Sequence, residues 1–194
     1  MERELTPSES LKLIETMIGQ AKQSFQRNSF YFMLWGVLLI AAMAVNYLMA
    51  ANGDPRGSYA WGVVGIIGGI ASVVHGAREG KKQLVSSFMD RVMLWLWMGF
   101  VATLLISLFG GATAGHGVPV GSIIVLTGLP TFVTGQLLRF RPLIFGGILF
   151  WVLGAVAFFV DVQATALLYI IAMVFGYLVP GYLLKRQEDG LRTA

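Results

Sequence analysis

The stretch TGLPTFVTGQLLRFRP, residues 127–142, ends an apolar run with a glycine, two leucines and two arginines. A similar ending, GYLVPGYLLKR, occupies residues 176–186, and a looser copy lies at Gly69–Lys82. In each copy a hydrophobic segment is followed by positive charge, which is the pattern of a membrane helix ending on the cytoplasmic side. The recurrence predicts repeated membrane-spanning hairpins and does not by itself indicate an activity.

Composition indicates an integral membrane protein. Of the 194 residues, 56% are hydrophobic and only 12% are charged, whereas soluble domains carry about 25% charged residues. The net charge of +4 comes from basic residues between apolar runs, so it indicates orientation in a membrane and no nucleic-acid partner. The absence of cysteine excludes disulfides, thiolate metal sites and cysteine nucleophiles.

Six apolar segments predict six transmembrane helices, because each approaches the ~20 residues that cross the hydrocarbon core of a bilayer. They are Phe30–Met49, Tyr59–His75, Val92–Phe109, Val118–Leu138, Leu143–Val160 and Ala164–Leu184. The predicted fold class is all-α: an integral membrane bundle over residues 30–185, followed by a short cytoplasmic tail at 186–194. Residues 1–29 contain no apolar signal-peptide core, so the first span is expected to direct insertion.

The basic residues predict the orientation of these spans. Of the 14 Lys and Arg residues, all except Arg56 lie near the termini or in the connections after the second and fourth spans. The positive-inside rule places those regions, and therefore both termini, in the cytoplasm. The expected location is the plasma (inner) membrane, crossed several times, with the lipid bilayer as the main partner.

The N-terminal residues 1–29 are predicted to contain a cytoplasmic amphipathic helix. Thr6-Pro7-Ser8-Glu9 supplies an N-cap, a proline in the first turn and a capping box. Apolar residues then follow at three- and four-residue steps and form one stripe: Leu11, Ile14, Ile18, Ala21 and Phe25. Two interpretations remain open, a helix lying in the membrane plane against the bundle and a helix that docks a cytosolic protein partner. We expect the in-plane arrangement.

The spans also pair into three hairpins, which suggests a pseudo-threefold repeat, because odd spans begin with aromatic residues and even spans end on glycine. Small residues at regular intervals predict faces on which helices pack closely. These residues are Gly65, Gly68, Gly69, Ser72 and Gly76 in the second span, and Thr127, Thr131 and Gly135 in the fourth. Pro130 and Pro180 lie late in even spans, where a kink either shapes a cavity or has no such role.

The chemistry of the spans argues against catalysis and ion coupling. No span has an Asp, Glu, Lys or Arg in its interior, whereas ion-coupled carriers usually bury such groups. His75 and His116 fall on opposite sides of the membrane in this topology, so they cannot share a metal. No serine is paired with a histidine at a matching depth. We therefore predict no catalytic residue, no metal site and no cofactor.

Three segments carry a family resemblance: LWGVLL at residues 34–39, Gly62–Lys82, and GYLVPGYLL at residues 176–184. Together they resemble the bacterial six-helix acid-resistance (HdeD-like) membrane protein family, over the six spans but not over residues 1–28. Pro55 and Pro119 match that family's outer turns, whereas the third outer turn, Asp-Val-Gln, has no proline. The resemblance implies a non-catalytic inner-membrane protein linked to stress tolerance, with no active-site residues to carry over.

Two functional hypotheses follow from these patterns. The first is a non-enzymatic accessory or stress-related membrane protein that engages a cytosolic partner through its N-terminal helix. The second is a subunit that binds or transports a small-molecule ligand, resembling a six-helix importer component. The outer face offers few polar groups to orient such a ligand, namely Asn46, Asn52, Asp54, His116, Asp161 and Gln163.

Overall fold

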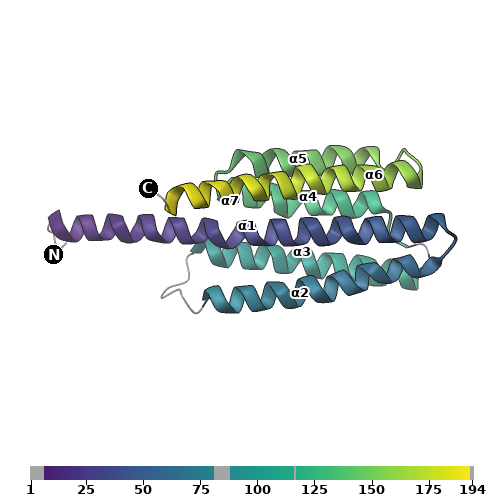
Figure 1. Cartoon of the computed structure of the whole chain (residues 1–194), viewed down its shortest axis with the longest axis horizontal. Coiled ribbons are helices and arrows are strands. Elements are labelled where there is room, and N and C mark those ends of the chain that lie inside the picture. The colour runs from purple at the N-terminus through teal and green to yellow at the C-terminus, as the bar shows by residue number, and fades with distance from the viewer. Residues whose placement is uncertain (1–6, 81–87, 116, 193–194) are drawn as a thin grey trace.

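The computed structural model describes the backbone of residues 7–80, 88–115 and 117–192, and the side chains of residues 29–78, 89–115 and 117–187. This part of the chain is helical apart from short turns (Figure 1). The α-helices are α1 (Pro7–Ala51), α2 (Tyr59–Gly80), α3 (Phe88–Thr113), α4 (Val120–Leu137), α5 (Arg141–Val156), α6 (Val162–Met173) and α7 (Val179–Arg192). A 3-10 helix, η1 (Pro55–Ser58), precedes α2, and a π-helical turn, η2 (Val174–Leu178), joins α6 to α7.

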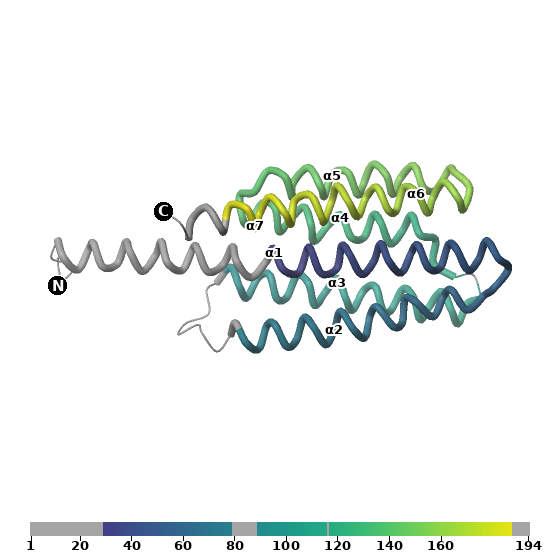
Figure 2. Tube along the Cα trace, in the orientation of Figure 1, coloured from purple at the N-terminus to yellow at the C-terminus, as the bar shows by residue number. Residues whose placement is uncertain are grey.

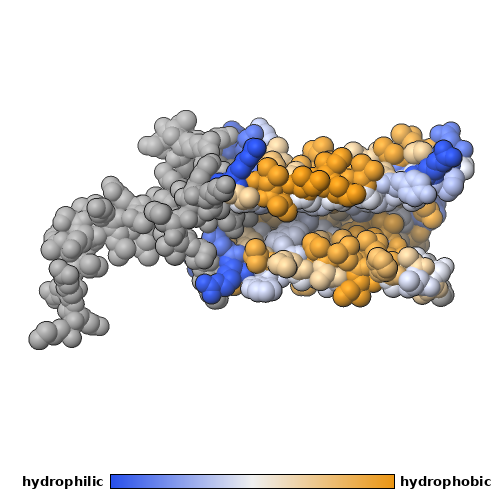
Figure 3. Space-filling view, turned by 90° about the horizontal axis from the view of Figure 1, so that it is seen from below, coloured by the Kyte–Doolittle hydropathy of each residue, from blue (hydrophilic) through white to orange (hydrophobic). Residues whose placement is uncertain are grey.

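The predicted all-α integral membrane bundle is confirmed. Among the described residues, five helical segments are long and apolar enough to cross a membrane, and the 16-residue α5 is a shorter apolar helix. The five segments are Ser29–Ala51, Pro55–Arg78, Met89–Thr113, Val120–Leu137 and Val162–Gln187. Figure 3 shows the corresponding band of apolar surface, with hydrophilic residues at both ends of the bundle.

The two ends of the bundle differ in charge. The α4–α5 turn and the end of α7 lie at one end, and the turns α1–α2, α3–α4 and α5–α6 lie at the other (Figures 1 and 2). We call the first the basic end, because it carries Arg78, Arg91, Arg139, Arg141, Lys185 and Arg186. At the opposite end, Asp54 accepts a hydrogen bond from the Arg56 amide and Asp161 accepts one from the Ala164 amide, so each carboxylate caps a helix.

The core of the bundle contains a chain of aromatic side chains that contact one another edge to face. The rings of Phe32 and Tyr177 lie edge to face, with centroids 5.3 Å apart, and Tyr177 makes the same contact with Phe150. Trp97 reaches Phe32 from α3, with centroids 6.1 Å apart. Edge-to-face pairs are the favoured geometry for such rings. This chain of contacts links α1, α3, α5 and η2.

The sequence predicts two elements where the structure has one helix. An N-terminal helix separate from the first span was expected, whereas α1 is unbroken from Pro7 to Ala51. The physical reason is that no proline follows Pro7 in this stretch and no glycine stands at the expected boundary near Asn28, so nothing ends the helix there. The stripe residues Leu11, Ile14, Ile18, Ala21 and Phe25 lie outside the residues whose side chains are described.

The closest helix pair crosses the boundary between two predicted hairpins. The three-hairpin scheme pairs α3 with α4, and α5 with the α6–α7 rod, yet α4 packs most extensively against α5. By contrast, α2 packs mainly on α1 and η1, and α3 packs mainly on α4. The result is a tightly packed α4–α5 side and a more open α2–α3 side.

Candidate functional site

The α4–α5 pair is held together by glycines spaced seven residues apart. Gly121, Gly128 and Gly135 on α4 face Gly147 and Gly154 on α5, and all five are buried. A Cβ placed on Gly147 would lie 2.7 Å from the Phe132 Cα, and one on Gly135 would lie 2.6 Å from the Ile144 backbone nitrogen. Real Cβ atoms do not approach backbone this closely, so only glycine allows the two backbones to meet here.

Three of the predicted packing residues, Thr127, Thr131 and Gly135, lie buried on α4 in this region. Gly135 belongs to the glycine seam, and Thr131 is fully buried beside it. The Thr131 hydroxyl donates to the Thr127 carbonyl at 2.8 Å, and Thr127 repeats the pattern with Ile123 at 2.7 Å. These buried hydroxyls are therefore satisfied within their own helix. Pro130 and Pro180 are also fully buried.

The α1–α2 pair is held by a tryptophan that covers a glycine. The Trp35 indole nitrogen donates to the Ser72 hydroxyl at 3.1 Å, and its ring covers Gly68, where a Cβ would lie 2.8 Å from the ring. Gly76 lies one turn beyond Ser72 on α2, and a Cβ there would lie 3.1 Å from the Tyr31 hydroxyl. The structure thus brings Gly68, Ser72 and Gly76 together against α1.

Gly65 and Gly69, predicted to pack against a neighbouring helix, contact no described residue in this way. A Cβ on either glycine, or on Gly62, would meet no heavy atom within 4 Å. The reason is geometric, since the α2 face that contacts α1 passes through Gly68 and Ser72 and leaves Gly65 turned away. The prediction for these two glycines is therefore corrected: they form an open face.

Apolar side chains project from both α2 and α3 beside this open face. On α2 they include Ile66, Ile67, Ile70 and Val73, and on α3 they include Leu94, Trp95, Met98, Leu105, Ile106 and Phe109. Figure 3 shows two apolar ridges separated by a groove along the bundle, on the side where α2 lies in Figure 1. Lipid contact accounts for exposed apolar side chains in a membrane bundle.

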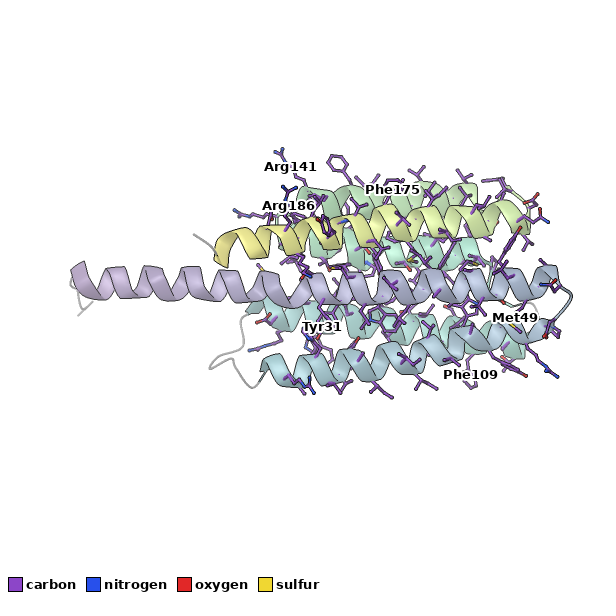
Figure 4. All side chains as sticks on the ribbon, viewed as in Figure 1. Tyr31, Met49, Phe109, Arg141, Phe175 and Arg186 are labelled. Atoms are coloured by element: carbon purple, nitrogen blue, oxygen red, sulfur yellow. The ribbon has the colours of Figure 1, made fainter. Side chains whose placement is uncertain are left out.

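A basic pocket lies where the α4–α5 turn meets α7. The cavity has a volume of about 610 Å³ and is lined by Arg139, Phe140, Arg141, Pro142, Leu183, Arg186 and Gln187. Figure 4 shows Arg141 and Arg186 at the same end of the bundle, with Phe175 nearer its middle. None of these residues was singled out as a site from the sequence, although Arg139, Arg141 and Arg186 belong to the recurring basic endings.

The histidines form no metal site in the described part of the chain. His75 stacks on Phe30, with ring centroids 3.9 Å apart, and its Nε2 atom is buried with no hydrogen-bond partner among the described residues. His116 lies outside the described residues. No group of three or more His, Cys, Asp or Glu side chains that could hold a metal ion occurs among the residues described.

Comparison of the chain with protein-family models, curated proteins and solved structures finds no match. The arrangement of side chains is therefore the basis for any functional assignment. It provides close helix packing, an apolar surface for lipid and a pocket with three guanidinium groups. These features are suited to association and to anion binding.

Proposed function

We propose that this protein is a non-enzymatic accessory protein of the inner membrane, with both termini in the cytoplasm, and that the N-terminal part of α1 engages a cytosolic protein partner. The observation that carries the proposal is the unbroken helix from Pro7 to Ala51. The resemblance to acid-resistance membrane proteins adds a stress-related role to the same proposal.

The length of α1 exceeds what a membrane span requires. Ser29–Ala51 alone is long and apolar enough to cross the bilayer. Residues 7–28 add about 33 Å of helix at 1.5 Å per residue. Because the helix continues without a break, its amphipathic part is the direct extension of a transmembrane segment. A stripe on such an extension is suited to a protein groove that receives the apolar face of a helix.

Three of the six polar residues named for the opposite end favour this proposal over a ligand-binding importer subunit. The carboxylates of Asp54 and Asp161 accept hydrogen bonds from backbone amides at 2.9 and 2.7 Å. The Asn52 side-chain amide donates to the Leu48 carbonyl at 2.8 Å. Polar side chains that orient a small ligand point into a cleft, whereas these three are engaged by their own turns.

Crosslinking along the helix tests the partner interaction. A photo-crosslinking amino acid at Ile14 or Ile18 is expected to capture one cytosolic protein in cells. The same probe at Thr16 or Gln23, which lie on the opposite face by the helical period, is the matched control. Capture from the stripe positions alone supports docking by the stripe. If Ile14 and Ile18 crosslink only to lipid or to this chain, the result would favour a helix lying in the membrane plane and contradict the proposal.

Cysteine labelling tests the orientation that the proposal needs. The chain has no cysteine, so single reporters are unambiguous. Cysteine in place of Asn52 should react with an impermeant maleimide in intact cells, and cysteine in place of Gln187 should react only after lysis, because positive charge is retained inside. Labelling of Gln187→Cys in intact cells would place the basic end outside and remove the basis for a cytosolic partner.

A further inference from the structure

The pocket at the basic end is built from two parts of the chain that are distant in sequence. Arg139 and Arg141 flank Phe140 in the α4–α5 turn, and Arg186 comes from α7. Phe140, which is buried, and Leu183, which is partly exposed, contribute apolar surface to the lining. The cavity of about 610 Å³ is within the size range of small-molecule sites. Three cationic residues and three apolar ones therefore line the same cavity.

These three cations have no counter-charge among the described side chains. Among the residues whose side chains are described, no ion pair involves Arg139, Arg141 or Arg186, and none of those that line the cavity is a carboxylate. Like charges held close together repel one another unless an anion lies between them. Guanidinium groups also present several N–H donors in a planar fork that matches phosphate oxygens. The pocket is thus electrostatically suited to a phosphate group.

The backbone at Arg139 supports a role for its side chain. The Phe140 amide donates to the Gly135 carbonyl at 2.9 Å and the Arg139 amide to the Gln136 carbonyl at 3.1 Å, which is the hydrogen-bond pattern of a Schellman ending. Arg139 occupies the left-handed position of this motif, with φ of 50°, where glycine is usual because it has no Cβ. Strained non-glycine residues of this kind cluster at functional sites.

An apolar surface leads from the pocket toward the middle of the membrane band. Phe175, Val179 and Leu183 follow one another at four-residue steps on the α6–α7 rod, and all three are exposed. Phe145 is exposed one turn beyond Arg141 on α5. Each of the two helices therefore presents an apolar face that ends at an arginine. This is the arrangement that a molecule with a charged head and hydrocarbon chains would contact along its length.

We propose that the pocket binds the phosphate of an anionic phospholipid, with the guanidinium groups of Arg139, Arg141 and Arg186 around the headgroup. The acyl chains lie along Phe175, Val179 and Leu183. Basic pockets between membrane helices on the cytoplasmic side bind headgroups of this kind. The apolar face favours a lipid over a free phosphate compound, because a soluble ligand would leave that face unused.

Lipid-dependent stability of the full chain tests the proposal. The protein is purified into phosphatidylcholine nanodiscs with or without phosphatidylglycerol, and native mass spectrometry measures which lipid is retained. Phosphatidylglycerol is expected to be retained preferentially and to raise the unfolding temperature. Loss of one pocket arginine should weaken the binding of phosphatidylglycerol about fivefold, on the basis of about 1 kcal/mol per arginine. The variants are Arg139→Gly, Arg141→Gln and Arg186→Gln, and the control is Arg91→Gln, at the same end on α3.

Two further measurements distinguish a lipid phosphate from a soluble phosphate and test the effect of the left-handed backbone at Arg139. Arg139→Gly should raise the unfolding temperature in phosphatidylcholine alone, because glycine relieves the left-handed backbone, and should reduce the further increase caused by phosphatidylglycerol. Glycerol phosphate in solution should have no effect. If it stabilises the protein as much as phosphatidylglycerol does, the ligand is a soluble phosphate and the lipid assignment fails. Equal weakening by Arg91→Gln, or none in the pocket variants, would also overturn it.

Discussion

Glycines line one face of α4 and one face of α2, but the two faces meet different surroundings. Gly121, Gly128 and Gly135 on α4 lie against the backbone of α5, whereas Gly65 and Gly69 on α2 face open space. The difference comes from the neighbouring helix. α5 offers its own glycines at 147 and 154, so both backbones can approach, whereas α1 offers Trp35, which occupies the space over Gly68 alone.

This comparison teaches that a pattern of small residues permits close packing but does not determine where it occurs. Lipid provides no hydrophobic drive for helices to associate, so contact depends on shape and hydrogen bonding from both partners. The α4–α5 seam has matching glycines on both helices. In the α1–α2 seam only α2 contributes glycines, and α1 contributes an aromatic ring and a side-chain hydrogen bond instead. The glycines at 65 and 69 have neither.

The largest expected effect is at the α4–α5 seam. Gly147→Leu should lower the free energy of unfolding by about 3 kcal/mol, because the new side chain meets the Phe132 backbone and cannot be accommodated by a rotamer change. Denaturation in mixed micelles measures the loss. Ala155→Leu, at an exposed position of the same helix, is the control and should be nearly neutral. Similar stability for both variants would mean that the seam is not closely packed.

Adjacent glycines on α2 sharpen the comparison within one helix. Gly68→Leu should destabilise the protein by about 1–3 kcal/mol, because it displaces the Trp35 ring. Gly69→Leu should have little effect, because a Cβ there meets nothing within 4 Å. Thermal unfolding in detergent distinguishes the two. Destabilisation by Gly69→Leu alone would show that the face toward α1 has been assigned to the wrong residues.

A smaller effect is expected from the hydrogen bond that joins α1 to α2. Trp35→Phe removes the donor to Ser72 and should destabilise the protein by about 0.6 kcal/mol for the lost hydrogen bond, with a further loss from the smaller ring. Trp95→Phe is the matched control, because Trp95 is exposed and has no described hydrogen bond. The bond would contribute nothing measurable if the two variants unfolded at the same denaturant concentration.

Deletion of residues 1–28 tests whether the bundle needs the extension of α1. The described core contacts begin at Ser29 and Phe32, so the truncated chain should insert and unfold at the same temperature as the full chain. Any interaction with a cytosolic partner should be lost. A truncated protein that fails to fold would assign these residues to the bundle itself and remove the docking proposal.

Much of the fold could be predicted from the sequence, because hydrophobic length and basic residues are local signals. The six segments and the common end of the basic residues follow from them. The unbroken α1 could not be predicted from its N-cap and stripe, which show where a helix begins but not that it continues into the next span. The seven-residue spacing of Gly121, Gly128 and Gly135 was a usable signal that the sequence analysis missed.

The basic pocket could not be predicted from the sequence, because no local pattern shows which distant residues come together. Arg186 lies beside Arg139 and Arg141 only because α7 returns to the α4–α5 turn. The left-handed backbone at Arg139 could not be predicted either, since an arginine at that position runs against the preference for glycine. The assignment of Gly65 and Gly69 failed for a related reason, because spacing shows that two glycines share a face but not which helix that face meets.

The most direct test of the contrast between the two glycine faces is a paired measurement of unfolding free energy for Gly135→Ala and Gly65→Ala in the same micelle. Gly135→Ala should lose about 2 kcal/mol, because its methyl group would lie 2.6 Å from the Ile144 backbone nitrogen. Gly65→Ala should be unchanged or gain about 0.5–1 kcal/mol, because alanine favours the helix and the site is open. Changes of the same sign and size in both variants would contradict the account.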